Sequence, residues 1–345
     1  MKRRFALFLC LLMLLPAHAH ADGAFTVSAR AACLIDAATG RILYAQNADA
    51  RYPMASTTKV MTALLALENA SLEEAVTAGE NAYGVEGTSI YLSAGETLSM
   101  RDMLYGLMLR SGNDAAVAIA EHIAGSVSGF ADLMDRRAVQ LGADAIFANP
   151  HGLPADAHEA SAHAMTLIAR AAMQIPAFRE IVGTQRATIP WVGNEYSRVL
   201  NNKNKLLATY PGATGIKTGF TKLAGRCLVF SAEQEGMELI GCVLNCPDWF
   251  GEAARLLDHG FAEYDAHTIL RAGDTVCHTA VTLACEPSLP LTVADDLIIP
   301  LAEGEQYVLD FQPQSAAAPI AAVSVPEWGL LPALRKIWQN WLNAW

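Results

Sequence analysis

The sequence predicts an α+β fold, in which helices cover an antiparallel sheet. A short pair of strands near the start is followed by a block of helical segments, then by three strands and a helix. This order predicts that the first and last strands share one sheet. The chain has 345 residues, 52% of them hydrophobic and 17% charged, which suits one large domain and a smaller one.

The first 21 residues have the pattern of a secretory signal peptide. Lys2, Arg3 and Arg4 precede the apolar run 5–15, and small residues follow at 17–21. A retained N-terminal anchor is the alternative, although this run is short for a bilayer. Loss of the three cations on cleavage shifts the net charge from −11 to −14, which argues against a nucleic-acid partner.

Local patterns predict the elements of the main domain in order. Residues 31–35 and 41–45 predict a β-hairpin, and the nearly continuous apolar run 60–67 predicts a buried helix. Ser99 and Asp102 form a capping box for a second helix, and Asp114 is expected to cap a third. The later segments are helices at 130–141, 162–173 and 251–264, strands at 215–220, 226–232 and 239–244, and a hairpin turn at 235–236.

The last eighty residues have a different character. Between about 266 and 325 helix signals fade and apolar residues are separated by Pro and Gly, which predicts a small β-rich domain. Residues 326–345 predict an amphipathic helix that lies in a membrane interface, and a helix docked on the protein itself or on a partner is the alternative. Its apolar face comprises Leu334, Ile337, Trp338, Trp341, Leu342 and Trp345. The predicted units are therefore 1–21, 22–265, 266–325 and 326–345.

The cysteine pattern argues against a metal site. None of the six cysteines left after cleavage has the spacing of zinc ligands, so we expect no metal and no cofactor. Cys227 with Cys242, or Cys277 with Cys285, could face each other across paired strands as disulfides. Buried free thiols would give the same pattern, so both alternatives stay open.

Ser56-Thr57-Thr58-Lys59 places a hydroxyl and an amine three residues apart at the start of the buried helix. A serine hydroxyl is a weak nucleophile that needs a base. A lysine that is desolvated near another cation can lose its proton close to neutral pH. Backbone N–H groups at the helix start can stabilise an oxyanion.

Two further motifs accompany this one. Ser111-Gly112-Asn113 lies in a break between two predicted helices, and Lys217-Thr218-Gly219 lies on a predicted strand. Each is weak alone. In this order, and on these elements, the three motifs resemble the set Ser-x-x-Lys, Ser-Asp-Asn and Lys-Thr-Gly of class A β-lactamases and penicillin-binding proteins.

With these motifs the chain resembles the low-molecular-mass penicillin-binding proteins, the serine D-Ala-D-Ala carboxypeptidases of peptidase family S11. The likeness runs from about 31 to 264 and includes 35–40, 149–153 and 215–221. It implies a DD-peptidase-like domain that removes the terminal D-alanine from peptidoglycan stem peptides and is acylated by β-lactams. It also implies a β-rich second domain followed by an amphipathic membrane-binding helix. With the signal peptide, this helix predicts a location on the outer face of the cytoplasmic membrane, beside the cell wall.

The same resemblance implies the catalytic roles. Ser56 would attack the carbonyl between the two D-alanines, with Lys59 as general base. Ser111 would relay a proton to the leaving amine, and Asn113 would position the Lys59 amine and the substrate amide.

The substrate-binding residues follow from the resemblance and from the strand. Lys217 and Thr218 would bind the terminal carboxylate of the substrate. Gly219, which lacks a side chain, would let the substrate approach the backbone closely. The N–H groups of Ser56 and Phe220 would form the oxyanion hole.

Two departures from the family pattern keep other functions open. Ser161-Ala162-His163-Ala164 stands where the family has Thr-Ala-x-Asp, and the second domain is short. The missing acid leaves a non-catalytic β-lactam or muropeptide-binding protein as the alternative. A β-lactamase is the nearest rival enzyme, but class A enzymes need a glutamate and an asparagine four residues later. Here the position four residues after Glu159 is His163, not asparagine. We expect His151 to stabilise a turn and His163 to face solvent.

Overall fold

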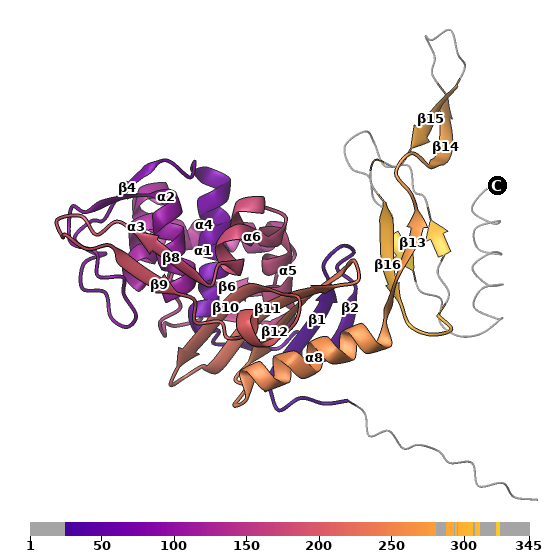
Figure 1. Cartoon of the computed structure of the whole chain (residues 1–345), viewed down its shortest axis with the longest axis horizontal. Helices are drawn as coiled ribbons and strands as arrows, with labels where there is room; N and C mark the ends of the chain where they lie inside the picture. The colour runs from indigo at the N-terminus through magenta and orange to yellow at the C-terminus, as the bar shows by residue number, and fades with distance from the viewer. Residues whose placement is uncertain are drawn as a thin grey trace, which may run out of the picture.

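The computed structural model describes residues 25–280, 288–292, 294, 296–305, 308–310 and 322–324. The signal peptide and the amphipathic helix lie outside these residues, so both stay predictions. In the part of the chain that is described, no helix is long and apolar enough to cross a bilayer. Figure 1 shows a sheet covered by helices, with further strands beyond the end of the last of these helices.

A five-stranded antiparallel sheet is the centre of the main domain. Its strand order is β10-β11-β12-β1-β2, so the N-terminal hairpin pairs with the late strands, as the sequence predicts. The strands are β1 (Ala31–Asp36), β2 (Ile42–Gln46), β10 (Ala213–Thr221), β11 (Gly225–Gln234) and β12 (Met237–Leu244). Because β10 is an edge strand, part of its backbone is free to pair with a peptide.

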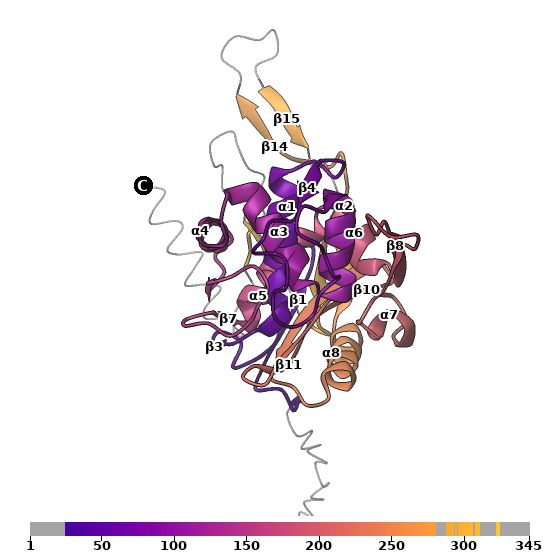
Figure 2. The ribbon, with the colours of Figure 1, turned by 90° about the vertical axis from the view of Figure 1, so that its left-hand side faces the viewer.

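Helices cover both faces of this sheet (Figure 2). One face packs on α1 and α5, and the other packs on α8, so β1 is buried at all six positions. The helices and turns of this domain are η1 (Ala55–Thr58), α1 (Lys59–Asn69), α2 (Met100–Tyr105), η2 (Gly106–Arg110), α3 (Asn113–Ala124), α4 (Val127–Gln140), α5 (Ala162–Met173), α6 (Pro176–Gly183), α7 (Leu206–Thr209) and α8 (Trp249–Glu263).

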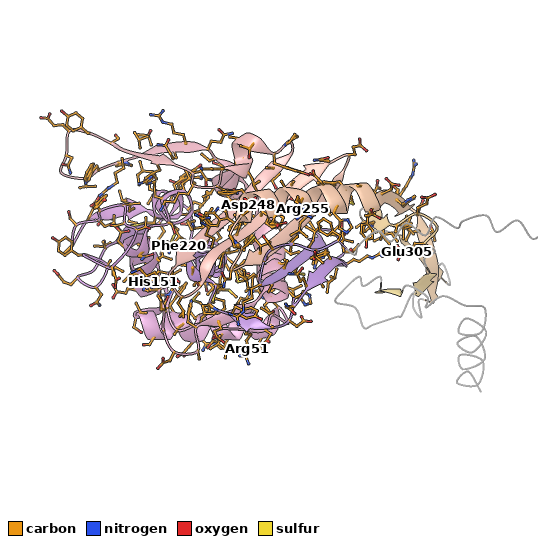
Figure 3. The ribbon with its side chains drawn as sticks, turned by 90° about the horizontal axis from the view of Figure 1, so that it is seen from below. Arg51, His151, Phe220, Asp248, Arg255 and Glu305 are labelled. Atoms are coloured by element: carbon orange, nitrogen blue, oxygen red, sulfur yellow. The ribbon has the colours of Figure 1, made fainter. Side chains whose placement is uncertain are left out.

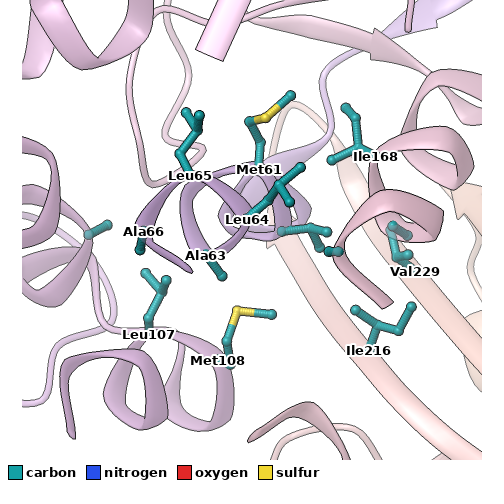
Figure 4. Packing of buried hydrophobic residues seen from close by; sticks show 14 of the residues in the cluster. Met61, Ala63, Leu64, Leu65, Ala66, Leu107, Met108, Ile168, Ile216 and Val229 are labelled. Atoms are coloured by element: carbon teal, nitrogen blue, oxygen red, sulfur yellow. The ribbon is translucent and has the colours of Figure 1, made fainter. Parts of the chain in front are cut away.

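The helix α1 lies in the larger of the two cores. Its first eight residues, 59–66, are all buried, and the nearly continuous apolar run 60–67 predicts such burial. Figure 4 shows its side chains between Leu107 and Met108 on one side and Ile216 and Val229 of the sheet on the other. Packing on all sides holds the N-terminal end of α1, where the motif Ser56–Lys59 begins, in a fixed position.

The predicted N-terminal cap of α2 is confirmed, but that of α3 is not. Ser99 caps α2 as predicted, since its Oγ accepts a hydrogen bond from Asp102 N at 3.1 Å. The expectation for Asp114 is wrong: α3 begins at Asn113 without a side-chain cap. The Asp114 carboxylate instead accepts from the backbone N–H groups of Ile90 (3.1 Å) and Leu92 (3.0 Å), which ties the preceding loop to α3.

Several short elements were not predicted. The hairpin of β8 (Arg186–Ile189) and β9 (Arg198–Asn201) is held by a buried ion pair between Arg198 and Glu96, 2.6 Å apart. Arginine and glutamate are typical of exposed positions, so the sequence pattern did not predict that this ion pair is buried. The other short strands are β3 (Arg51–Tyr52), β4 (Ala75–Thr77), β5 (Thr97–Ser99), β6 (Ala145–Ile146) and β7 (Glu159–Ser161).

Strands follow α8 in the described residues. They are β13 (Asp265–Leu270), β14 (Thr275–Ala280), β15 (Ser288–Thr292), β16 (Leu297–Leu301), β17 (Val308–Asp310) and β18 (Ala322–Ser324). Arg41 connects them to the main domain: its guanidinium pairs with Glu305 at 2.5 Å and donates to Pro300 O at 2.5 Å. The division into domains at residue 265 stays a prediction.

Four cysteines have described side chains, and all four are buried free thiols: Cys33, Cys227, Cys242 and Cys246. The alternative of a Cys227–Cys242 disulfide is therefore wrong. Cys242 is paired across the sheet with Cys33, and Cys227 is opposite Gly219. The Cys277–Cys285 pair lies outside the described side chains.

Candidate active site

Ser56 lies in the tight turn η1, which leads directly into α1. The residue before it, Ala55, has φ +49°, a left-handed conformation that costs energy in a residue with a side chain. Two hydroxyls of the turn stabilise it: Thr57 Oγ1 donates to Met54 O at 2.6 Å, and Thr58 Oγ1 donates to Ala55 O at 2.8 Å. The nucleophile motif thus begins in a strained turn rather than in the first turn of the helix itself.

Lys59 is fully buried beneath Ser56. Its Nζ lies 3.0 Å from Ser56 Oγ, 2.7 Å from Asn113 Oδ1 and 2.6 Å from His151 O. Two of these partners are carbonyl oxygens, which can only accept. A neutral amine would donate its two hydrogens to them and keep its lone pair for the Ser56 hydroxyl. This is the geometry of a general base.

The electrostatics of the site favour that neutral amine. Burial, the nearby Lys217 and the more distant Lys203 hold the pKa of Lys59 well below its usual range. Burial, with a contribution from Lys203, lowers the pKa of Lys217 to about 7. Neither Lys59 nor Lys217 belongs to an ion pair among the described residues. The two lysine amines of this site are therefore desolvated and without a carboxylate partner.

The second motif lies at the break between η2 and α3, as predicted. Asn113 is fixed at both ends of its amide, since Nδ2 donates to Glu86 O at 2.6 Å and Oδ1 accepts from Lys59. Ser111 is buried and has φ +66°. Lys217 donates to Thr218 O, and in this structure no hydrogen bond joins Ser111 to Lys217 or to Lys59.

The third motif lies on the edge strand β10, with Lys217 and Thr218 buried. The structure gives a reason for Gly219 that the sequence did not predict. A Cβ at this position would lie 2.9 Å from the backbone nitrogens of Ser56 and Thr57, so glycine makes room for the nucleophile turn. The close approach of substrate to this backbone stays a prediction. Phe220 is 61% exposed, and Figure 3 shows it with His151 at the end of the molecule remote from Glu305.

The loop 149–158 completes the site, and sequence reasoning missed most of its contribution. Its backbone carbonyl at His151 binds Lys59, and Gly152, with φ +90°, lies so close to Ala55 that a Cβ would be 1.9 Å from Ala55 O. The sequence feature that could have indicated this close contact is Gly152 in a turn-rich segment. The expectation that His151 stabilises a turn is confirmed, because Leu153 N donates to its Nδ1 at 3.2 Å. His163 lies at the surface, 3.0 Å from Asp49.

The missing acidic residue of α5 leaves no gap in the site. Ala164 is buried, and its N–H donates to Ser161 Oγ at 3.0 Å in a normal helix cap. Among the described residues, Asn204 Nδ2 is the one buried side-chain atom that needs a hydrogen-bond partner and lacks one. Within the described ranges, no buried side-chain donor near Ala164 therefore lacks a partner that a carboxylate would provide.

Comparison with known proteins identifies this arrangement. The model of the family Peptidase S11, D-alanyl-D-alanine carboxypeptidase, matches residues 17–248, which include all three motifs. The chain belongs to the S11 family. This S11 chain is 32% identical, over 322 residues, to the D-alanyl-D-alanine carboxypeptidase DacF of Bacillus subtilis, with 88% of this chain and 82% of the relative covered.

Solved structures agree with the S11 assignment. Penicillin binding protein 5 of Haemophilus influenzae superposes with a TM-score of 0.71 at 31% identity, covering 83% of this chain and 87% of that one. A mutant of a DD-transpeptidase from Streptomyces superposes with a TM-score of 0.66 at 34% identity, covering 69% of this chain and 99% of that one. The second comparison shows that most of the Streptomyces chain corresponds to about two thirds of this S11 chain.

Proposed function

We propose that this chain is a serine-type D-Ala-D-Ala carboxypeptidase that removes the terminal D-alanine from peptidoglycan stem peptides. The observation that carries the proposal is the position of Lys59, buried between two carbonyl oxygens with its lone pair free for Ser56 Oγ at 3.0 Å. Membership of the S11 family and the names of the relatives support the same reaction.

Acylation begins with proton transfer from Ser56 Oγ to Lys59 Nζ. The Ser56 oxygen attacks the carbonyl between the two D-alanines, and the N–H groups of Ser56 and Phe220 stabilise the oxyanion. When the tetrahedral intermediate collapses, the C–N bond breaks. The proton on Lys59 then passes through Ser111 to the amine of the departing D-alanine.

Substrate binding uses the edge strand. The terminal carboxylate lies against the Lys217 ammonium and the Thr218 hydroxyl, where a charge-assisted hydrogen bond forms in a site with little water. The peptide pairs with the free backbone of β10 by strand addition. Asn113, held at both ends of its amide, positions Lys59 and the substrate amide.

Deacylation regenerates the enzyme. Water attacks the ester on Ser56, Lys59 accepts the proton of this water, and the shortened peptide leaves with its new carboxylate. A β-lactam acylates Ser56 in the same way, but its amine leaving group stays attached to the acyl group. Water attacks that adduct slowly, so the enzyme is inhibited.

The alternatives receive no support from the site. A non-catalytic binder was suggested by the missing acid at Ala164, yet the base, the nucleophile and the cation on β10 are all in place. A β-lactamase would need a glutamate that activates water beside Ser56. The candidate Glu159 lies on β7, paired with Ile146.

The location and the domain division belong to the same proposal. An N-terminal signal peptide supports export, and the apolar face of 326–345 supports attachment to the outer face of the cytoplasmic membrane beside the cell wall. The catalytic domain would span 22–265 and a β-rich domain 266–325. The substrate of the enzyme is found in that location.

Mass spectrometry of the purified protein tests the proposal. With a labelled penicillin we expect a single adduct on Ser56, and with a D-Ala-D-Ala pentapeptide we expect release of one D-alanine per peptide. An adduct on Ser111 or Ser161 would show that the nucleophile is wrongly assigned. Penicillin binding without peptide turnover would favour the non-catalytic binder.

A further inference from the structure

His158 lies beneath the nucleophile turn, and the proposed reaction leaves it without a role. Its side chain is buried, and its ring contacts Phe147 edge-on. The Nε2 atom lies 2.8 Å from Thr58 Oγ1, and the Nδ1 atom lies 2.9 Å from Ala148 N. Through Thr58, which donates to Ala55 O at 2.8 Å, the ring is connected to the residue that precedes Ser56.

The donor and acceptor groups determine the direction of each hydrogen bond in this series. A backbone N–H can only donate, so His158 Nδ1 accepts from Ala148 and carries no hydrogen. The neutral ring must then carry its hydrogen on Nε2, which donates to Thr58 Oγ1. Because the Ala55 carbonyl can only accept, the Thr58 hydroxyl donates to it. All three donors therefore point the same way, from Ala148 toward Ala55.

This series of hydrogen bonds ends at the peptide group between Ala55 and Ser56, which is important for catalysis. The Ala55 carbonyl and the Ser56 N–H belong to one planar peptide group, so fixing the oxygen also fixes the direction of the N–H. Ala55 has φ +49°, a conformation that needs support from its surroundings. A chain of aligned hydrogen bonds also polarises its members, which strengthens the Ser56 N–H as a donor.

We propose that His158 is a positioning residue of the oxyanion hole: through Thr58 it fixes the Ala55–Ser56 peptide so that the Ser56 N–H points at the developing oxyanion. The inference rests on the proposed function, because it takes Ser56 as the nucleophile. Burial and the nearby Lys59 lower the pKa of His158 to about 4, which keeps the ring neutral at ordinary pH. His151, which also lies near Lys59, has its pKa lowered to about 3.

Three variants interrupt or preserve the chain. His158→Asn keeps an acceptor for Ala148 N but cannot reach Thr58, and Thr58→Val removes the hydroxyl at nearly constant volume. Thr58→Ser keeps the hydroxyl. His163→Asn is the matched control, since this histidine lies at the surface beside Asp49. For each we would measure the penicillin acylation rate, kcat and KM for a D-Ala-D-Ala peptide, and the melting temperature.

Loss of a whole oxyanion donor costs about 10²–10³-fold in kcat, and a misdirected donor should cost less. We expect His158→Asn and Thr58→Val each to lower kcat and the acylation rate about tenfold or more. KM should stay within about twofold, because Lys217 and Thr218, which would bind the carboxylate, take no part in this series of hydrogen bonds. The double variant should be no slower than the slower single variant. Thr58→Ser and His163→Asn should retain nearly full rates.

The inference is wrong if the rate losses of the two single variants multiply in the double variant. It is also wrong if either single variant acylates at the wild-type rate, or if KM rises while kcat is unchanged. Should His158→Asn fail to fold, Thr58→Val alone decides, since it leaves the ring in place. Failure of the proposed function would be recognised separately, as the absence of a penicillin adduct on Ser56 in the wild-type protein.

Discussion

Lys59 and Lys217 share one site, but their partners differ. Lys59 has three hydrogen-bond partners, and two of them are carbonyl oxygens that can take both hydrogens of a neutral amine. Burial and the nearby Lys217 favour that neutral form by lowering the pKa of Lys59. Lys217 has one, the backbone oxygen of Thr218, so its ammonium keeps donors for a ligand. The first arrangement suits a base and the second suits an anchor for an anion.

Lys59→Ala tests the base. Loss of a general base typically costs about 10²–10⁴-fold, so we expect the rate of penicillin acylation to fall by that factor. The melting temperature should not fall much, because the variant removes a buried amine that has no counter-ion. Lys222→Ala, in the exposed turn after β10, is the matched control. Acylation of Lys59→Ala at the wild-type rate would show that another group is the base.

The pH dependence of KM tests the anchor. The pKa of Lys217 is lowered to about 7, so in the free enzyme its charge is present below that pH and lost above it. A carboxylate is bound by the charged form, and KM for the peptide should therefore rise as pH increases through about 7 and beyond. Lys217→Arg stays charged throughout, and its KM should be nearly flat with pH. A flat wild-type profile between pH 6 and 9 would contradict this role.

At the scale of elements, the site depends on three segments whose backbones are in direct contact. The turn η1 lies between the edge strand β10 and the loop 149–158. At the two contact points a side chain would clash, at Gly219 with Ser56 N and at Gly152 with Ala55 O. The catalytic groups therefore come from distant parts of the sequence, yet their relative positions are fixed by backbone contacts.

Gly152→Ala tests this packing. The new Cβ would lie 1.9 Å from Ala55 O, so the loop or the turn must move, and we expect acylation to fall at least tenfold. Gly142→Ala is the control, since φ is also positive (+66°) but no atom lies within 4 Å of the new Cβ. It should cost only the conformational strain, about 1–2 kcal/mol in the free energy of unfolding, and keep full activity. Equal activity in both variants would show that the close approach has no catalytic importance.

The elements that the sequence predicted well are those with strong local signals. The apolar run at 60–67 and the cap at Ser99 each determine their own helix. The three motifs likewise predicted one site, and in the structure Lys59 Nζ is within hydrogen-bond distance of Ser56 and Asn113. Lys217 contributes to the lowered pKa of Lys59. What the sequence left out depends on long-range contacts: the roles of Asp114 and Gly219, and the hydrogen bond from His158 to Thr58, arise between segments up to about a hundred and sixty residues apart.

At the scale of the whole molecule, the site lies far from the C-terminal strands. Arg41 connects the two parts through Glu305 and Pro300, at the opposite end of the sheet from Phe220 (Figure 3). In the solved structure of the Streptomyces DD-transpeptidase mutant, 99% of the chain is covered by 69% of this one, so a chain of about main-domain size can fold by itself.

A chain ending at Asp265 should therefore fold and acylate with penicillin at a rate within about threefold of the full protein. Its melting temperature should fall modestly, because the contacts of Arg41 with Glu305 and Pro300 are lost. Arg41→Ala in the full chain separates the loss of this contact from the loss of the strands. A truncated protein that is folded but not acylated would show that the C-terminal strands support the site.

We expect the C-terminal segment to attach the protein to the membrane surface. Residues 332–345 would form a helix of about 21 Å, shorter than the hydrocarbon core of about 30 Å, and five polar side chains on one face would be costly inside it. A helix lying flat would bury its six apolar residues, while Arg335 and Lys336 would contact anionic headgroups. The acidic body, with a net charge of −14 after cleavage, opposes adsorption elsewhere on such a surface.

Truncation after Pro326 tests this arrangement. Because the helix would provide nearly all of the affinity, we expect the truncated protein to leave the membrane fraction while its activity on a soluble peptide is unchanged. The double variant Arg335→Glu and Lys336→Glu should weaken binding to anionic vesicles, most strongly at low salt, where the attraction is least screened. If the truncated protein still sediments with membranes, another surface binds them. If it loses activity on the soluble peptide, the segment packs against the enzyme, and the docked helix is the correct description.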